Sequence, residues 1–214
     1  MKYDAIIFDL DGTLWDASQA SANGWNKALQ TLGLGVEINA ADIRSIAGLP
    51  LEDCVRTLVP QLKASKFDKL LPVLNLEEEK ALRQTGGELY PQVEKYLRSM
   101  AQQTSLMIVS NCQQWYLEYF LELMGLQQHF KDTDCYGNTG TPKSETLKGI
   151  VARNGLENPI YIGDTAWDFS AAKKAKMPFI HAAYGFGEIE DAPSSVASFS
   201  ELESLLLVNG LKKP

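Results

Sequence analysis

Residues 4–10, DAIIFDL, constrain the fold more than any other stretch, because they form an apolar run of strand length. Continuous apolar strands are typical of the centre of a parallel sheet that is covered on both faces. The run leads into DLDGT at residues 9–13, so two carboxylates lie where the strand ends. Residues two apart on an extended chain face the same way, about 6.6 Å apart, so Asp9 and Asp11 are expected to share one site. Gly12 lets the backbone turn away sharply.

Two carboxylates at the end of one strand favour phosphoryl-transfer chemistry. One carboxylate can attack phosphorus and form an aspartyl-phosphate, while the other moves a proton on and off the leaving oxygen. We therefore predict Asp9 as the nucleophile and Asp11 as the general acid and then base. Thr13 supplies a hydroxyl for substrate binding. The alternative is that this segment is only a turn, since Asp and Gly are common turn formers.

Candidate phosphate-binding groups follow a second predicted strand at residues 105–110. Ser110 ends this strand and Asn111 enters the next helix, where a hydroxyl and free backbone N–H groups can hold phosphate oxygens. Ser and Asn are also common helix caps, which is the structural alternative. Lys143 precedes a predicted helix and can neutralise charge shared by a nucleophile and a phosphoryl group. Its alternative is an ordinary surface lysine.

A third strand, predicted at residues 159–164, ends in a possible metal ligand. Mg²⁺ takes hard oxygen ligands, commonly one or two carboxylates with waters and a phosphate oxygen, so Asp164 together with Asp9 meets that need. Asp168 lies one helical turn further on, where it can order the waters or pair with Lys143. The alternative makes Asp164 a helix cap and Asp168 a partner of the helix dipole.

These motifs resemble those of the haloacid dehalogenase-like hydrolase superfamily, whose first motif Asp-x-Asp-Gly-Thr is met at residues 9–13. The resemblance implies Asp9 as nucleophile and Mg²⁺ ligand, and Asp11 as acid/base with its backbone carbonyl on the metal. It further implies Ser110 and Lys143 on the phosphoryl group and Asp164 on Mg²⁺. The Lys motif departs from many relatives, because Ser144 follows Lys143 where Pro is common. Haloacid dehalogenases themselves are disfavoured, since they lack the second aspartate of the first motif.

Residues 15–85 predict an inserted helical cap, because about 70 residues of helix and turn are far more than a simple crossover needs. Helices are expected at 15–34, 40–47 and 51–62, with one or two more within 70–84 and the acidic residues 77–79 near a helix N-terminus. The insert is similar to the cap of phosphoglycolate phosphatase-like members. Trp15 and Arg44 are candidate substrate contacts, although a core Trp and a surface ion are the simpler interpretations.

Beyond the cap, alternating strands and helices predict the rest of an α/β core. We expect residues 1–14 and 86–214 to form a Rossmann-like parallel sheet with helices on both faces. The predicted strands are 105–110, 130–136, 159–164 and 177–182, and the predicted helices are 92–102, 113–123, 144–154, 165–176 and 200–208.

The composition limits the partners of the chain. A net charge of −7 argues against binding nucleic acid over a broad face, which needs a basic surface. No apolar run approaches a membrane span, and the N-terminus leads straight into a strand, so we expect a cytoplasmic protein without a membrane partner. Three widely spaced cysteines fit a reducing compartment. We expect a monomer or weak homodimer.

The predicted function is hydrolysis of a small phosphorylated metabolite by a Mg²⁺-dependent phosphatase. Uncatalysed phosphomonoester hydrolysis is so slow that a metal, a lysine and a covalent step are proportionate to it. A phosphomutase similar to β-phosphoglucomutase is the first alternative, because it shares the same motifs. A non-catalytic regulator that binds metal or phosphate on the same scaffold is the second.

Overall fold

A six-stranded sheet forms the centre of the fold, in the computed structural model that describes residues 3–208. Residues 1–2 and 209–214, which the predicted core domain includes, lie outside the described residues. The strand order is β5-β4-β1-β6-β7-β8, and every neighbouring pair is parallel. The strands are β1 (Ala5–Phe8), β4 (Ser105–Ser110), β5 (Asp132–Cys135), β6 (Pro159–Gly163), β7 (Phe179–Ala182) and β8 (Ser195–Val196).

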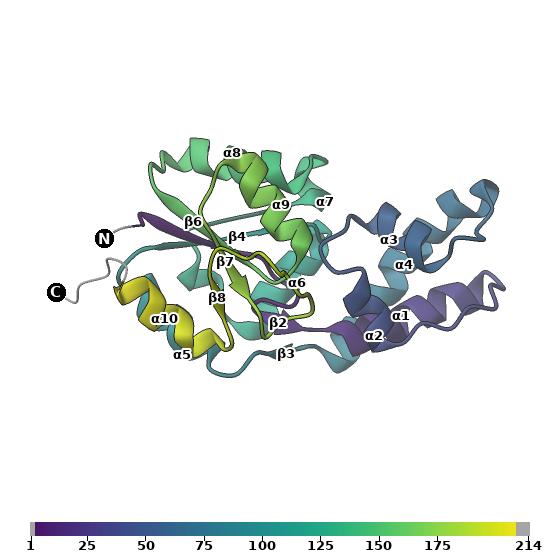
Figure 1. The fold of residues 1–214 in the computed structure, drawn as a ribbon. Coiled ribbons are helices and arrows are strands. Elements are labelled where there is room, and N and C mark those ends of the chain that lie inside the picture. The colour runs from purple at the N-terminus through teal and green to yellow at the C-terminus, as the bar shows by residue number, and fades with distance from the viewer. Residues whose placement is uncertain (1–2, 209–214) are drawn as a thin grey trace.

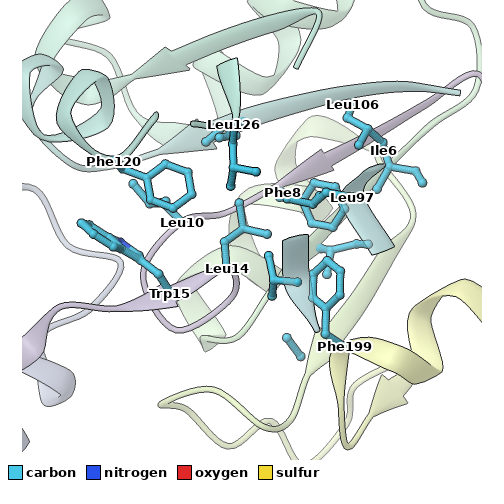
Figure 2. Packing of buried hydrophobic residues seen from close by; sticks show 14 of the residues in the cluster. Ile6, Phe8, Leu10, Leu14, Trp15, Leu97, Leu106, Phe120, Leu126 and Phe199 are labelled. Carbon is cyan, nitrogen blue, oxygen red and sulfur yellow. The ribbon is translucent and has the colours of Figure 1, made fainter. Parts of the chain in front are cut away.

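Helices cover both faces of this sheet, because its central strands are apolar on both sides. Ile6 and Phe8 of β1 lie on one face of the sheet and belong to the same apolar cluster as Phe199 (Figure 2). The ring centres of Phe8 and Phe199 are 5.8 Å apart. Ile7 faces the opposite side and packs near Leu147. The first face carries α5 (Val93–Ala101), α6 (Gln114–Met124) and α10 (Phe199–Val208), and the second carries α8 (Lys143–Asn154) and α9 (Ala166–Ala175). The predicted α/β architecture is confirmed.

Four further helices extend from one end of the sheet and have an apolar cluster of their own (Figure 1). They are α1 (Ser18–Thr31), α2 (Ala40–Ser45), α3 (Leu51–Leu58) and α4 (Ala64–Thr85). Trp25, Val55 and Leu74 are among the residues buried between them. Two antiparallel strands, β2 (Trp15–Asp16) and β3 (Glu88–Leu89), pair at the point where the chain leaves the sheet and returns to it.

Several details differ from the predictions. The short strands β2, β3 and β8, the helix α7 (Tyr136–Thr139) and the 3₁₀ turn at Gln127–His129 were not predicted. Helix α4 is a single helix that begins at Ala64 and contains Pro72. Residues 77–79 therefore lie in its second half, and the prediction that they flank a helix N-terminus was wrong. Within residues 3–208, no helix has the length and hydropathy needed to cross a bilayer.

Helices α1 and α4 approach very closely around Gly24 and Glu78. A Cβ on Gly24 would lie 2.4 Å from the Cα of Glu78. The Glu78 side chain is buried, and burial raises its pKa to about 7, although hydrogen bonds with Ser21 and Trp25 lower it. The contact thus depends on one glycine and encloses one carboxyl group.

The close approach predicts that Gly24→Ala destabilises the protein. Ala is favoured over Gly inside a helix by about 1 kcal/mol, but the added methyl group meets backbone atoms of α4, so we expect a net loss of about 1–3 kcal/mol in the free energy of unfolding. Urea denaturation measures this. The control is Gly149→Ala in α8, where no atom lies within 4 Å of the added Cβ. A Gly24→Ala protein as stable as this control contradicts the packing described.

The buried carboxyl predicts that Glu78→Gln changes stability in a pH-dependent way. The pKa of Glu78 is raised from 4.5 to about 7 on folding, so ionisation favours the unfolded chain. Wild-type protein should lose stability relative to Glu78→Gln as pH rises from about 4.5 to 7, by about 3 kcal/mol in total, with no further change above that range. Urea denaturation of both proteins at pH 5 and pH 8 tests this. An equal difference at the two pH values contradicts it.

Candidate active site

The carboxyl ends of β1, β4 and β6 bring three predicted site residues to one edge of the sheet. These strands are neighbours, and Phe8 of β1 is in register with Ile108 on one side and Ile162 on the other. Asp9 and Asp164 directly follow β1 and β6, and Ser110 is the last residue of β4. This edge of a parallel α/β sheet is where ligands commonly bind.

A buried lysine links two carboxylates at this edge. Lys143 is the first residue of α8, and its Nζ donates to Asp9 Oδ1 at 2.9 Å and to Asp168 Oδ1 at 2.6 Å. All three side chains are buried. Burial by itself disfavours an ammonium group, but the two carboxylates outweigh it and raise the pKa of Lys143. The predicted pairing of Asp168 with Lys143 is present.

Asp168 is held by hydrogen bonds on both oxygens. Besides Lys143, Oδ1 accepts from the Tyr161 hydroxyl at 3.0 Å. Oδ2 accepts from the Thr165 backbone N–H at 3.0 Å and from its hydroxyl at 2.6 Å, which completes the capping box of α9. Burial raises the pKa of Asp168, but Lys143 and Thr165 outweigh it and the net shift is downward. Asp168 is thus a fixed anion whose main contact is Lys143.

Asp164 is oriented by two loops. Its Oδ1 accepts from the Thr13 hydroxyl at 3.3 Å, and its Oδ2 accepts from the Phe186 backbone N–H at 2.8 Å. Gly12 has a φ of +78°, and a Cβ there would lie 2.0 Å from Asp164 Oδ2. A side chain on Gly185 would likewise lie 2.3 Å from Asp164 Cβ. The glycine of the first motif is required both for its turn and for this close approach.

Asp11 turns toward aromatic side chains. Its Oδ1 accepts from the Tyr116 hydroxyl at 2.6 Å and from the Trp15 Nε1–H at 3.2 Å. Burial raises the pKa of Asp11 to about 6, and these two hydrogen bonds limit the rise. A carboxyl group with this pKa is populated in both protonation states near neutral pH, which suits an acid and base.

Three carboxylates share this site with one ammonium group, that of Lys143, so the site carries excess negative charge. One oxygen from each of Asp9, Asp164 and Asp168 lies within 4.8 Å of the others. Burial and the neighbouring Asp168 raise the pKa of Asp9 to about 7, and burial with Asp168 and Asp9 raises that of Asp164 well above its usual value. The Lys143 ammonium group lowers both pKa values but does not balance the burial and the neighbouring carboxylates. A divalent cation with hard oxygen ligands fits this need.

A cavity of about 110 Å³ lies between this edge of the sheet and α1–α4. Asp9, Asp11, Ser110 and Asn111 contribute to its lining on the sheet side. The Asn111 Nδ2 donates to the Gly48 carbonyl at 2.6 Å, which joins the sheet edge to the segment between α2 and α3. The cavity is thus enclosed by both parts of the chain.

Besides Lys143, three predicted substrate contacts do not line this cavity. Trp15 is fully buried against Tyr116 and Phe120, and its indole binds Asp11. Arg44 pairs with Asp16 at 2.7 Å and lines a separate depression. Thr13 binds Asp164 instead of facing the cavity. These three residues support the site from outside the cavity.

Sequence reasoning missed several residues that shape the site. Tyr116 binds Asp11, Tyr161 binds Asp168, and Phe186 binds Asp164 and lines the cavity. His181 was assigned no role, yet its Nε2 lies 3.2 Å from the Asp164 carbonyl. Only the Gly-Phe-Gly segment at 185–187 carries a signal in the sequence, because clustered glycines mark close backbone approaches.

Comparison with known proteins agrees with this arrangement. Residues 6–182 match the haloacid dehalogenase-like hydrolase family. A phosphoglycolate phosphatase from Xanthomonas campestris pv. campestris is 28% identical over 196 residues, covering 89% of this chain and 88% of the relative. A 5'-nucleotidase from Pseudomonas aeruginosa is 25% identical over 203 residues, covering 89% and 87%.

A solved structure has the same fold. The haloacid dehalogenase-like family hydrolase from Streptococcus pneumoniae superposes with a TM-score of 0.85 at 22% identity, covering 96% of this chain and 99% of that one. The family match spans most of the sequence and includes Asp9, Lys143 and Asp164. The chain belongs to the haloacid dehalogenase-like hydrolase family.

Proposed function

We propose that the chain is a Mg²⁺-dependent phosphatase that hydrolyses a small phosphorylated metabolite through an aspartyl-phosphate on Asp9. The observation that carries the proposal is the buried contact of Lys143 with Asp9, next to Asp164. Negative charge develops on the phosphoryl group during transfer. A lysine next to the nucleophile, together with a cation site next to the lysine and the nucleophile, can stabilise this charge. The broader class, hydrolysis of phosphoric monoesters, follows from family membership and from the phosphatases among the relatives.

Asp9 and Asp164 are the proposed side-chain ligands of Mg²⁺, and the backbone carbonyl of Asp11 is the third protein ligand that we predict. The donor set fits the ion, because it consists of hard oxygens with unbalanced negative charge. Asp168 is better suited to holding Lys143, since both of its oxygens already accept hydrogen bonds. When bound, Mg²⁺ neutralises charge on the phosphoryl oxygens.

The residues of the chain have different roles in the two chemical steps. Asp9 attacks phosphorus while Asp11, in its protonated form, gives a proton to the departing alkoxide. Asp11 next takes a proton from a water molecule that attacks the aspartyl-phosphate, which releases inorganic phosphate and restores Asp9. Lys143 and Ser110 hold the phosphoryl oxygens, and Asn111 contacts the substrate from the cavity. Asp168 keeps Lys143 in position.

We propose that residues 15–85 act as a cap over this site, with residues 3–14 and 86–208 as the described part of the core domain. The separate apolar cluster of α1–α4 and the two-stranded link β2–β3 support this division. A cap that closes over the substrate excludes water from the covalent intermediate. A cytoplasmic location and a monomeric or weakly dimeric state stay predictions.

The nucleophile assignment predicts that Asp9→Asn loses turnover of p-nitrophenyl phosphate by about 10³-fold or more, because a neutral amide cannot replace the attacking carboxylate. Steady-state kinetics with Mg²⁺ measures this. Asp191→Asn, at an exposed position, serves as the matched control and should retain wild-type turnover. Undiminished turnover by Asp9→Asn contradicts the proposal.

The cation assignment predicts that chelation with EDTA abolishes turnover and that added Mg²⁺ restores it. Mg²⁺ should also raise the melting temperature of the wild-type protein, since an ion that binds only the folded state stabilises it by mass action. Asp164→Asn removes a proposed ligand and should lose most of this shift. Turnover that survives chelation, or an unchanged shift in Asp164→Asn, contradicts the assignment.

A further inference from the structure

The cavity next to the site is mostly apolar on the side that α1–α4 contribute. Trp25, Ile43, Ile46, Leu49 and Cys54 form much of this wall. The sheet side holds Asp9 and Asp11, where the phosphoryl group would bind. The alcohol part of a substrate would therefore occupy the region between this wall and the catalytic carboxylates.

The cavity offers no cation to the alcohol part of a substrate. Among the described residues that line it, none is Lys, Arg or His. Lys143 is not among the lining residues, and its Nζ contacts Asp9 and Asp168. Arg44 lies just outside the lining, where its guanidinium pairs with Asp16, donates to the Ser18 hydroxyl at 3.0 Å and lies 5.7 Å from the centre of the Phe186 ring. A carboxylate on the leaving alcohol would find no opposite charge in the cavity.

Glu78 makes the cavity less suitable still for an anion. This residue of α4 lines the cavity and is 9% exposed, with Ser21 and Trp25 as hydrogen-bond partners. Burial raises its pKa to about 7, so a large fraction is ionised at neutral pH. A substrate carboxylate next to it would add a like charge in a poorly solvated place, which is strongly unfavourable.

Asn111 supplies an independent requirement for a hydrogen-bond donor. Its amide orientation follows from the 2.6 Å bond that Nδ2 donates to the Gly48 carbonyl. The carbonyl oxygen Oδ1 is buried and accepts no hydrogen bond within the described part of the chain. An unpaired buried acceptor costs free energy, and a ligand that donates to it removes this cost.

We propose that the leaving alcohol of the substrate carries a hydrogen-bond donor, either a hydroxyl or an ammonium group, and no carboxylate, and that Glu78 and Asn111 recognise this donor. The inference rests on the proposed phosphatase function. It makes Glu78 and Asn111 specificity-determining residues at the cap and core sides of one cavity. The proposed substrate differs from 2-phosphoglycolate, for which several relatives are named, because the alcohol part of 2-phosphoglycolate carries a carboxylate.

Two substrates that differ in one group test the proposal. 2-Hydroxyethyl phosphate and 2-phosphoglycolate have the same length, with CH₂OH in one where the other has a carboxylate. We expect kcat/KM of the wild-type enzyme with Mg²⁺ to be at least about tenfold higher for 2-hydroxyethyl phosphate. Equal values, or a preference for 2-phosphoglycolate, overturn the inference, and turnover of p-nitrophenyl phosphate in the same preparation shows that the phosphatase function still stands.

Glu78→Gln tests the recognition itself, because it removes the charge with little change in shape. The preference for 2-hydroxyethyl phosphate should fall by about threefold or more. Glu79→Gln, on the same helix but paired with Arg83, should leave the preference unchanged. An unchanged preference in Glu78→Gln overturns the role of Glu78.

A binding measurement keeps the inference testable even if no substrate is hydrolysed. Calorimetric titration of the Asp9→Asn protein with each phosphate in the presence of Mg²⁺ should give the lower Kd for 2-hydroxyethyl phosphate, again by about tenfold. If the wild-type enzyme hydrolyses neither compound but this difference in Kd is found, the phosphatase proposal is contradicted, while recognition of a hydrogen-bond donor in the cavity is supported. Equal affinities overturn the inference.

Discussion

The contact of one buried lysine with two buried carboxylates is the interaction on which the rest of this site depends. Lys143 ties the end of β1, through Asp9, to the first turn of α9, through Asp168. Without the ammonium group, two carboxylates would face each other in a poorly solvated place, which costs several kcal/mol per uncompensated ion. Asp164 nevertheless stays uncompensated, and this imbalance makes the site a place for a divalent cation and a phosphoryl group.

Much of this arrangement follows from sequence, because parallel sheet topology converts order along the chain into proximity. Apolar runs at β1, β4 and β6 are long enough to be recognised as central strands, and the polar residue that ends each run then falls on the same edge. The strand at 105–110 has its predicted bounds. The pairing of Lys143 with Asp168 was one of two predicted roles for Asp168, and it joins positions 25 residues apart.

The parts that could not be predicted depend on long-range contacts. Strands β2, β3 and β8 have two residues each and are defined by their partners. Tyr116 lies 105 residues from Asp11, and nothing local marks its hydroxyl as the group that limits the pKa of Asp11. In the sequence, Glu78 is one of three consecutive acidic residues on a helix. It is the one of the three that is buried, because Gly24 lets α1 approach α4 at that point. Burial, not residue type, separates it from its neighbours.

The two polar atoms of the Asn111 amide group have different surroundings. Its amide nitrogen joins the segment between α2 and α3 to the sheet edge, while its buried carbonyl oxygen accepts no hydrogen bond within the described residues. In the proposed cap mechanism the cap opens to release product, and this hydrogen bond must then break. Under the proposals made above, the same side chain would then contribute both to substrate recognition and to closure of the cap, so a substitution of Asn111 would change both.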